Sequence, residues 1–217
     1  MSSPSPPLSP PPPLSLPRVI WPLAPPPPDQ RFGEFVDARN EEPKPPRNLQ
    51  PVEGNEEDWE VVLVLDSREV RTLQDRAFLQ NRLQQVGVNC EVRAIALGDM
   101  QWILKGPSDK EIMLNTIVER KNTRDLAMSI VDGRFNEQQF RLIQCECQHP
   151  VYLVEGGLRS QDMISVDSLQ SGIMKTVVNR NIYVYMSTSI DDTVVFLKEL
   201  HERVCDSVHR YFQCGDE

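Results

Sequence analysis

Apolar and polar residues follow two different periodicities from Trp59 onward, and together these predict alternating strands and helices. A continuous β-branched run over 61–65, ending at Asp66, is typical of a strand buried on both faces. Leu79, Leu83 and Val86 recur at helical spacing, and Gly87 is expected to stop that helix. Further strands are expected at 89–97, 100–104, 112–119, 151–154 and 182–186, and further helices at 122–131, 134–147, 166–179 and from about 191.

This order of elements predicts the fold class α/β, with one mixed sheet flanked by helices and a hairpin between 100–104 and 112–119. The short helix capped at Asn122 or Thr123 is expected to point its apolar residues inward, including Val131. His201 falls on the apolar stripe of the last helix, which favours a buried or interface histidine over a metal ligand.

The first 58 residues have a different composition, since 17 of the 19 prolines lie at or before Pro51. Such a segment buries too little apolar surface to offset its ordering entropy, so 1–58 is predicted to be a disordered Pro-rich arm. The folded domain is expected at 59–212, followed by a tail at 213–217. The apolar island Val19–Trp21 within the arm is either a docking motif for a partner, such as a reader of Pro-rich motifs, or plain linker.

Net charge, cysteine spacing and hydropathy limit the kinds of protein and partner that the sequence permits. The chain carries −9, of which −5 belongs to residues after Asp58, so a nucleic-acid partner requires locally concentrated positive charge or acids neutralised by metal. The five cysteines form no CxxC pair, which favours reduced structural thiols in an intracellular protein. The sequence has neither an apolar run long enough for a membrane span nor a signal peptide pattern, and no membrane partner is expected.

Acidic residues and a lysine are expected at the ends of neighbouring strands. Asp66 ends the first strand, Asp99 follows the second, and Glu119 and Lys121 end the fourth. Carboxylates gathered in this way repel one another unless a cation lies among them, so the pattern predicts a site for a hard metal such as Mg²⁺. The metal would activate water against a phosphodiester, with Lys121 stabilising the developing charge.

Each acid also has an ordinary structural explanation. Asp66 can open a turn, Gly98–Asp99 is a common turn dipeptide, and Asp125 lies in the first turn of a helix, where the helix dipole favours acids. Glu119 can pair with a neighbouring base. The four fixed letters of ERKxxxD, however, arise by chance in roughly one chain of this length in several hundred.

Four segments resemble the XPF-type structure-specific DNA endonucleases: LDSRE (65–69), GDM (98–100), IVERKNTRDL (117–126) and SIVDGRFNEQQFRL (129–142). The last is similar to the crossover-junction branch, whose catalytic subunit pairs with an Eme-type non-catalytic subunit in a heterodimer. The resemblance implies a restriction-endonuclease-like fold, nuclear localisation, and Mg²⁺- or Mn²⁺-dependent cleavage of branched DNA (3′ flaps, forks and nicked Holliday junctions) in recombination and repair.

The resemblance also implies roles for individual residues, and no acid of the family's set is replaced. The family's metal ligands fall on Asp66, Asp99 and Glu119. Its other active-site positions fall on Glu69, a further acid; Lys121, the catalytic lysine; Arg120, expected in a supporting ion pair; and Asp125, which closes the signature.

Arg134, Gln138 and Arg141 share one face of the helix after Gly133 and suit the phosphates of a DNA strand. The alternative is a solvated face of an amphipathic helix. Phe140, Ile143 and Cys147 are expected on another face.

The sequence also departs from the family. Relatives carry a tandem helix-hairpin-helix module after the nuclease domain, and no pair of Gly-centred hairpins follows Gly172. The chain is therefore expected to be a fragment, a truncated isoform or a minimal form with weak DNA affinity. Arg124 stands where close relatives can have another acid, and Met100 where an aromatic residue is common. The leading hypothesis is therefore a metal-dependent endonuclease, and the alternative is a non-catalytic nuclease-like subunit that binds DNA or a partner.

Overall fold

The computed structural model describes residues 19–20, 52, 54–68, 73–145, 147–156, 164–180 and 182–214. Most of the expected arm and residues 215–217 lie outside these ranges. Strands and helices alternate as the hydrophobic pattern predicts. In chain order they are β1 Val19–Ile20, the short 3₁₀ helix Glu56–Asp58, β2 Glu60–Asp66, α1 Leu73–Gln85, β3 Cys90–Arg93, β4 Met100–Lys105, the 3₁₀ turn Pro107–Asp109, β5 Glu111–Asn122, α2 Thr123–Val131, α3 Arg134–Gln144, β6 His149–Glu155, α4 Val166–Arg180, β7 Tyr183–Ser187 and α5 Ile190–Cys214.

The strands form one sheet in the order β1-β7-β6-β5-β4-β2-β3. β4 pairs antiparallel with both β2 and β5, which confirms the expected hairpin between β4 and β5. The pairs β2/β3, β5/β6 and β6/β7 are parallel. The predicted mixed α/β sheet is therefore confirmed.

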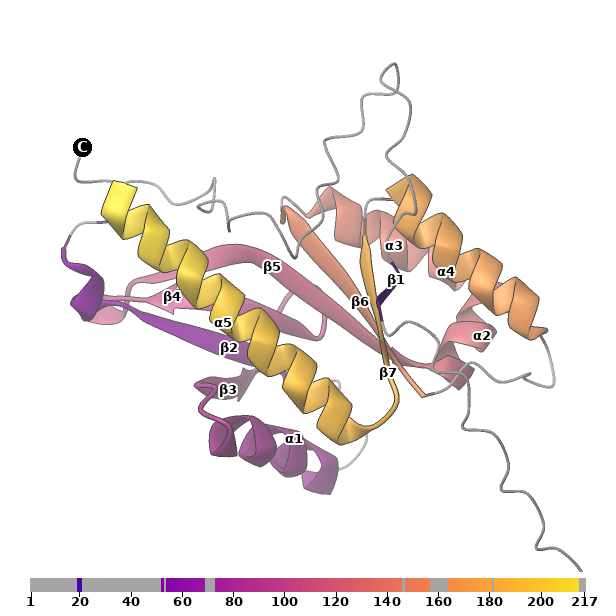
Figure 1. Cartoon of the computed structure of the whole chain (residues 1–217), viewed down its shortest axis with the longest axis horizontal. Helices are drawn as coiled ribbons and strands as arrows, with labels where there is room; N and C mark the ends of the chain where they lie inside the picture. The colour runs from indigo at the N-terminus through magenta and orange to yellow at the C-terminus, as the bar shows by residue number, and fades with distance from the viewer. Residues whose placement is uncertain are drawn as a thin grey trace, which may run out of the picture.

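Helices cover the two faces of the sheet unequally. α1 and α5 pack on one face against side chains such as Leu63, Trp102 and Leu153, and Figure 1 shows α5 running across the strands beside α1. α2, α3 and α4 contribute to a second core on the β5–β7 half of the opposite face, around Ile117 and Tyr152. On the β2–β4 half of that face, Val62, Val64 and Ile103 form a small cluster, and no helix of the described residues packs against it.

Several element boundaries differ from the prediction. β3 ends at Arg93 instead of continuing to 97, because the chain bends over 96–99 to enter β4. Val131, expected to point inward, is 52% exposed, because it is the last residue of α2. Of the expected apolar set, only Leu126 and Ala127 are buried. α3 ends at Gln144, so Cys147 is not on that helix.

The inward face of α3 consists of Phe135, Gln139 and Leu142, whereas Phe140 and Ile143 are exposed. The apolar pattern at 140 and 143 therefore does not mark the buried face. The residues that pack against β6 and α4 are instead those one position earlier, Gln139 and Leu142, together with Phe135.

Some residues of the expected arm contact the domain. Val19–Ile20 pairs antiparallel with β7 and adds a strand to an edge that otherwise exposes unpaired backbone groups. The N–H of Val52 donates a 3.3 Å hydrogen bond to the hydroxyl of Tyr211 on α5. Contacts between described residues of the arm and the domain therefore occur before Trp59.

Cys90, Cys145, Cys147 and Cys205 are free thiols, as expected for those positions. None of the helices in the described ranges combines the length and the apolar character needed to cross a bilayer.

Candidate active site

Two acidic residues lie side by side at the ends of neighbouring strands. Asp66 ends β2, and its N–H donates a 2.8 Å hydrogen bond to the carbonyl oxygen of Asp99, just before β4. The N–H of Asp99 in turn donates a 2.8 Å hydrogen bond to the carbonyl of Val118 in β5. Both acids are buried, at 4% and 6% exposure. The backbone therefore brings Asp66, Asp99 and Glu119, the residue after Val118, to one end of three strands.

Strand alternation decides which side of the sheet each residue faces. Asp66 shares a side of β2 with Val64, and Glu119 and Lys121 share a side of β5 with Ile117. The strand register links Val64 to Ile117 through one residue of β4, so these two sides are the same. Asp66, Glu119 and Lys121 thus face the side of the sheet that α2 and α3 partly cover.

The carboxylate of Asp66 is held by Arg68. Arg68 donates from Nη2 to Oδ2 at 2.8 Å, from Nε to Oδ2 at 3.0 Å and from its backbone N–H to Oδ1 at 3.0 Å. Burial opposes ionisation of the Asp66 carboxyl, but these hydrogen bonds and the positive charge of Arg68 outweigh it and lower its pKa below the ordinary value. Because the Arg68 side chain is 64% exposed, it can leave the carboxylate without unpacking the core.

Asp99 is held from the other side by the signature segment. Its Oδ2 accepts a 2.5 Å hydrogen bond from the N–H of Arg120. Gly98 permits this approach, because its φ is +72° and a Cβ there would lie 2.7 Å from a side-chain carbon of Ile117. The Gly-Asp dipeptide therefore fits the turn between 93 and 100 against β5.

Glu119 lies directly opposite a buried phenol. The parallel register of β5 and β6 pairs Glu119 with Tyr152. Burial raises the pKa of Tyr152, and the negative charges of Glu119 and Asp99 raise it further. The carboxylates of both acids are thus close enough to act electrostatically on the same hydroxyl.

The lysine of the signature is positioned by α3. Nζ of Lys121 donates a hydrogen bond to Oε1 of Gln138. A residue expected to contact DNA and the expected catalytic lysine are therefore in direct contact, and this contact fixes where the ammonium lies.

Arg120 makes the ion pair expected of it. Its Nη2 lies 2.8 Å from Oε2 of Glu155 at the end of β6, and both side chains are mostly buried. Thr193 of α5 donates to the other oxygen of Glu155 at 2.7 Å. Arg120 thus ties β5 to β6 and, through Glu155, to α5, while its own N–H holds Asp99.

Asp125 has the structural role that the sequence left open for it. The side-chain oxygen of Asn122 accepts from the N–H of Asp125 at 2.8 Å, and Nδ2 of Asn122 donates to Oδ2 of Asp125 at 2.9 Å. Asn122 is therefore the N-cap of α2, and the carboxylate of Asp125 completes the cap.

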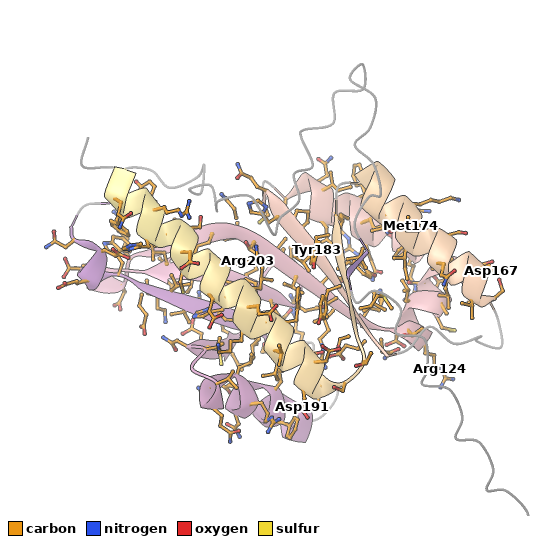
Figure 2. The ribbon with its side chains drawn as sticks, in the orientation of Figure 1. Arg124, Asp167, Met174, Tyr183, Asp191 and Arg203 are labelled. Atoms are coloured by element: carbon orange, nitrogen blue, oxygen red, sulfur yellow. The ribbon has the colours of Figure 1, made fainter. Side chains whose placement is uncertain are left out.

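The two arginines of α3 lie on the exposed surface near the site. Nε of Arg134 donates to Oδ2 of Asp132 at 2.7 Å, and this contact lowers the pKa of the exposed Asp132 carboxyl. Arg141 is also exposed. Arg124 lies exposed on the first turn of α2, away from the sheet (Figure 2).

The donor set fits a hard cation in ligand type and strand position, but the side chains do not form a ready site. In the part of the chain that the structure describes, no three His, Cys, Asp or Glu side chains lie together as metal ligands would. Arg68 forms an ion pair with Asp66, and the N–H of Arg120 holds Asp99. Glu69, the fourth expected acid, lies outside the described residues.

Sequence reasoning missed three residues of this region, namely Arg68, Tyr152 and Glu155. Arg68 stands two positions after Asp66, a spacing that permits the observed contact and was a usable signal. Tyr152 and Glu155 belong to a strand whose local pattern indicates only burial. Their proximity to Glu119 and Arg120 follows from the parallel register with β5.

Comparison with known proteins gives one family and a consistent set of relatives. The model of the ERCC4 domain matches residues 65–200, more than half of the chain. A Candida albicans protein named crossover junction endonuclease MUS81 is 40% identical over 144 residues, which cover 65% of this chain and 24% of that protein. The protein of that name from Debaryomyces hansenii is 38% identical over 155 residues (69% and 24%), and the one from Aspergillus fumigatus is 34% identical over 178 residues (75% and 30%). The chain thus spans 24–30% of the length of these relatives.

Solved structures show the same fold. XPF from Aeropyrum pernix matches with a TM-score of 0.52 and 22% identity, covering 65% of this chain and 60% of that one. The same protein in complex with DNA matches with a TM-score of 0.52 and 24% identity, covering 66% and 64%. These likenesses confirm the expected nuclease-like fold.

Proposed function

Since the chain belongs to the ERCC4 domain family, we propose that it is a structure-specific DNA endonuclease that hydrolyses phosphodiester bonds in branched DNA. One observation carries the proposal: the hydrogen-bonded path from Asp66 through Asp99 to Val118, which gathers acids from three strand ends beside Lys121. The names of the fungal relatives support the same activity.

The proposed metal ligands are Asp66, Asp99 and Glu119, with Glu69 as a further acid. Carboxylate oxygens are the ligands that Mg²⁺ and Mn²⁺ prefer, and buried acids at adjoining strand ends gain most from a cation. Asp66 joins this set by exchanging the guanidinium of Arg68 for the ion. When bound, the ion polarises the scissile phosphate and lowers the pKa of a water nucleophile.

The remaining residues of the signature position charge. Lys121, steadied by Gln138, stabilises negative charge that develops on the attacked phosphate. Arg120 holds Asp99 through its N–H and is itself held by Glu155, so it keeps the Asp99 carboxylate in place. Asp125 acts through the cap of α2, which orders the segment after the signature.

The exposed arginines of α3, Arg134 and Arg141, suit the phosphates of the substrate strand. The proposed substrates are 3′ flaps, replication forks and nicked Holliday junctions, cut to leave a 5′-phosphate and a 3′-hydroxyl. The proposed partner is an Eme-type subunit in a heterodimer, and the proposed compartment is the nucleus.

A second candidate function is a non-catalytic, nuclease-like subunit that binds DNA or a partner. Two observations favour it: Asp66 is paired with Arg68, and the described ranges contain no preformed three-ligand site.

A cleavage assay separates the two functions. The 217-residue chain is incubated with end-labelled 3′-flap DNA and Mg²⁺, alone and with an Eme-type subunit. We expect cutting by the wild type and none by Asp99→Asn, because asparagine keeps the shape of the side chain but lacks its charge. Asp167→Asn is the matched control, since Asp167 is exposed on the first turn of α4 (Figure 2) and should leave cutting unchanged.

Cutting that persists in Asp99→Asn would indicate a contaminating nuclease. Binding of flap DNA without cutting in every wild-type reaction would favour the non-catalytic subunit.

A further inference from the structure

The hydroxyl of Tyr152 is polar, buried and without a hydrogen-bond partner among the described residues. The residue is 1% exposed and lies in the middle of β6. Buried hydroxyls nearly always have a partner, because leaving one unpaired in the core is costly. Phenylalanine would fill the same volume without that cost, so packing alone does not account for the hydroxyl.

The ring of Tyr152 is held in one orientation. It meets Phe135 of α3 edge to face, with ring centroids 5.7 Å apart and planes at 90°. The ring therefore lies between the sheet and α3, and its hydroxyl has little freedom to seek a partner elsewhere.

A proposed metal ligand lies opposite this residue in the sheet. Glu119 pairs with Tyr152 in the register of β5 and β6, so the two side chains lie on the same side of the sheet. A phenol hydroxyl is a hydrogen-bond donor, and an ionised carboxylate is the acceptor to which it bonds most strongly. Glu119 is therefore the candidate acceptor.

We propose that Tyr152 is a positioning residue of the active site, whose hydroxyl donates a hydrogen bond to the Glu119 carboxylate as that carboxylate turns to a bound divalent cation. The hydrogen bond fixes one carboxylate oxygen and leaves the other for the metal. This inference rests on the proposed function, because it concerns the same metal site. Metal ligands are commonly oriented in this way by donors behind them.

The test measures metal affinity directly, with Mn²⁺ titrated calorimetrically into the full chain. We expect Tyr152→Phe to weaken Mn²⁺ binding by about 10-fold or more, the usual effect of removing a donor behind a metal ligand. The Tm of the metal-free variant should not fall, because the ring keeps its contacts and only an unpaired hydroxyl is lost.

Tyr185→Phe is the matched control. The hydroxyl of Tyr185 donates to Oδ1 of Asp192 at 2.9 Å on the opposite side of the sheet. Its removal should lower the Tm and leave Mn²⁺ affinity unchanged, which is the reverse of the pattern expected for Tyr152→Phe.

Asp99→Asn in the same titration separates the inference from the proposed function. If the wild type binds Mn²⁺, Asp99→Asn does not, and Tyr152→Phe binds as the wild type does, the role of Tyr152 is wrong and the metal site stands. If the wild type binds no Mn²⁺, the metal site and the role of Tyr152 are both wrong.

Discussion

Acidification from pH 7 to pH 5 should destabilise the fold through one buried imidazole, that of His201. The ring is 8% exposed, and its Nδ1 accepts a 3.1 Å hydrogen bond from Nε1 of the fully buried Trp102. Nε2 lies 3.6 Å from the sulfur of Cys205. The neutral ring fits this arrangement with its proton on Nε2, whereas a second proton on Nδ1 would face the indole N–H.

The direction of the effect follows from the pKa of His201. Burial lowers it below 6.5, and the charge of Glu202 opposes that shift only in part. Between the folded pKa and about 6.5, the unfolded chain therefore binds more protons than the folded one. As the pH is lowered through this window, the free energy of unfolding therefore decreases. For one proton the decrease is at most about 1.4 kcal/mol per pH unit.

The variant His201→Leu shows how much the hydrogen bond between Trp102 and His201 contributes to stability at neutral pH. Leucine cannot accept from Trp102, and a buried donor left without a partner costs about 1–3 kcal/mol. The variant should therefore be less stable than the wild type at pH 7. At pH 5 the difference should shrink, because the variant has lost the acid-sensitive group.

Urea unfolding followed by tryptophan fluorescence at pH 7, 6 and 5 measures both effects. His209→Gln is the control, since His209 is exposed and its contacts with Glu56 and Gln213 lie at the surface, and it should keep the acid-side loss of the wild type. A gap between the wild type and His201→Leu that stays constant over this pH range would refute the assignment of the loss to His201.

Three further predictions follow from the site. Gly98→Ala should cost about 1–3 kcal/mol in urea unfolding, because the new Cβ meets Ile117 at 2.7 Å and φ is +72°; unchanged stability would contradict the close approach. Lys121→Ala should lower the rate of flap cleavage about 10²–10³-fold in single-turnover assays while DNA still binds, and a loss confined to binding would remove its role at the phosphate. Arg68→Ala should raise the pKa of Asp66. The ion pair stabilises the wild type above about pH 3.8, and this stability is lost on acidification, so the variant should lack it. If the acid unfolding curves of the two proteins coincide, the ion pair is disproved.

The elements that sequence reasoning located best are those with strong local patterns. The apolar run that forms β2 and the capped start of α2 at Asn122 depend on short-range preferences, which a single chain displays openly. Weak patterns misled where packing decided the outcome. Val131 satisfies helical spacing but lies at the last residue of α2, where little covers it. Cys147 lies beyond the end of α3.

The sequence by itself determined which residues are candidates for the chemistry, because the acids, the lysine and their spacing can be read directly from the chain. Only the tertiary structure decided what each of them contacts. Lys121 meets Gln138, 17 residues away, and Trp102 meets His201, 99 residues away. Tyr152 faces Glu119 through the register of two parallel strands. Strand register and helix docking depend on the packing of the whole core, in which distant residues compete for the same space, and no local pattern records that outcome.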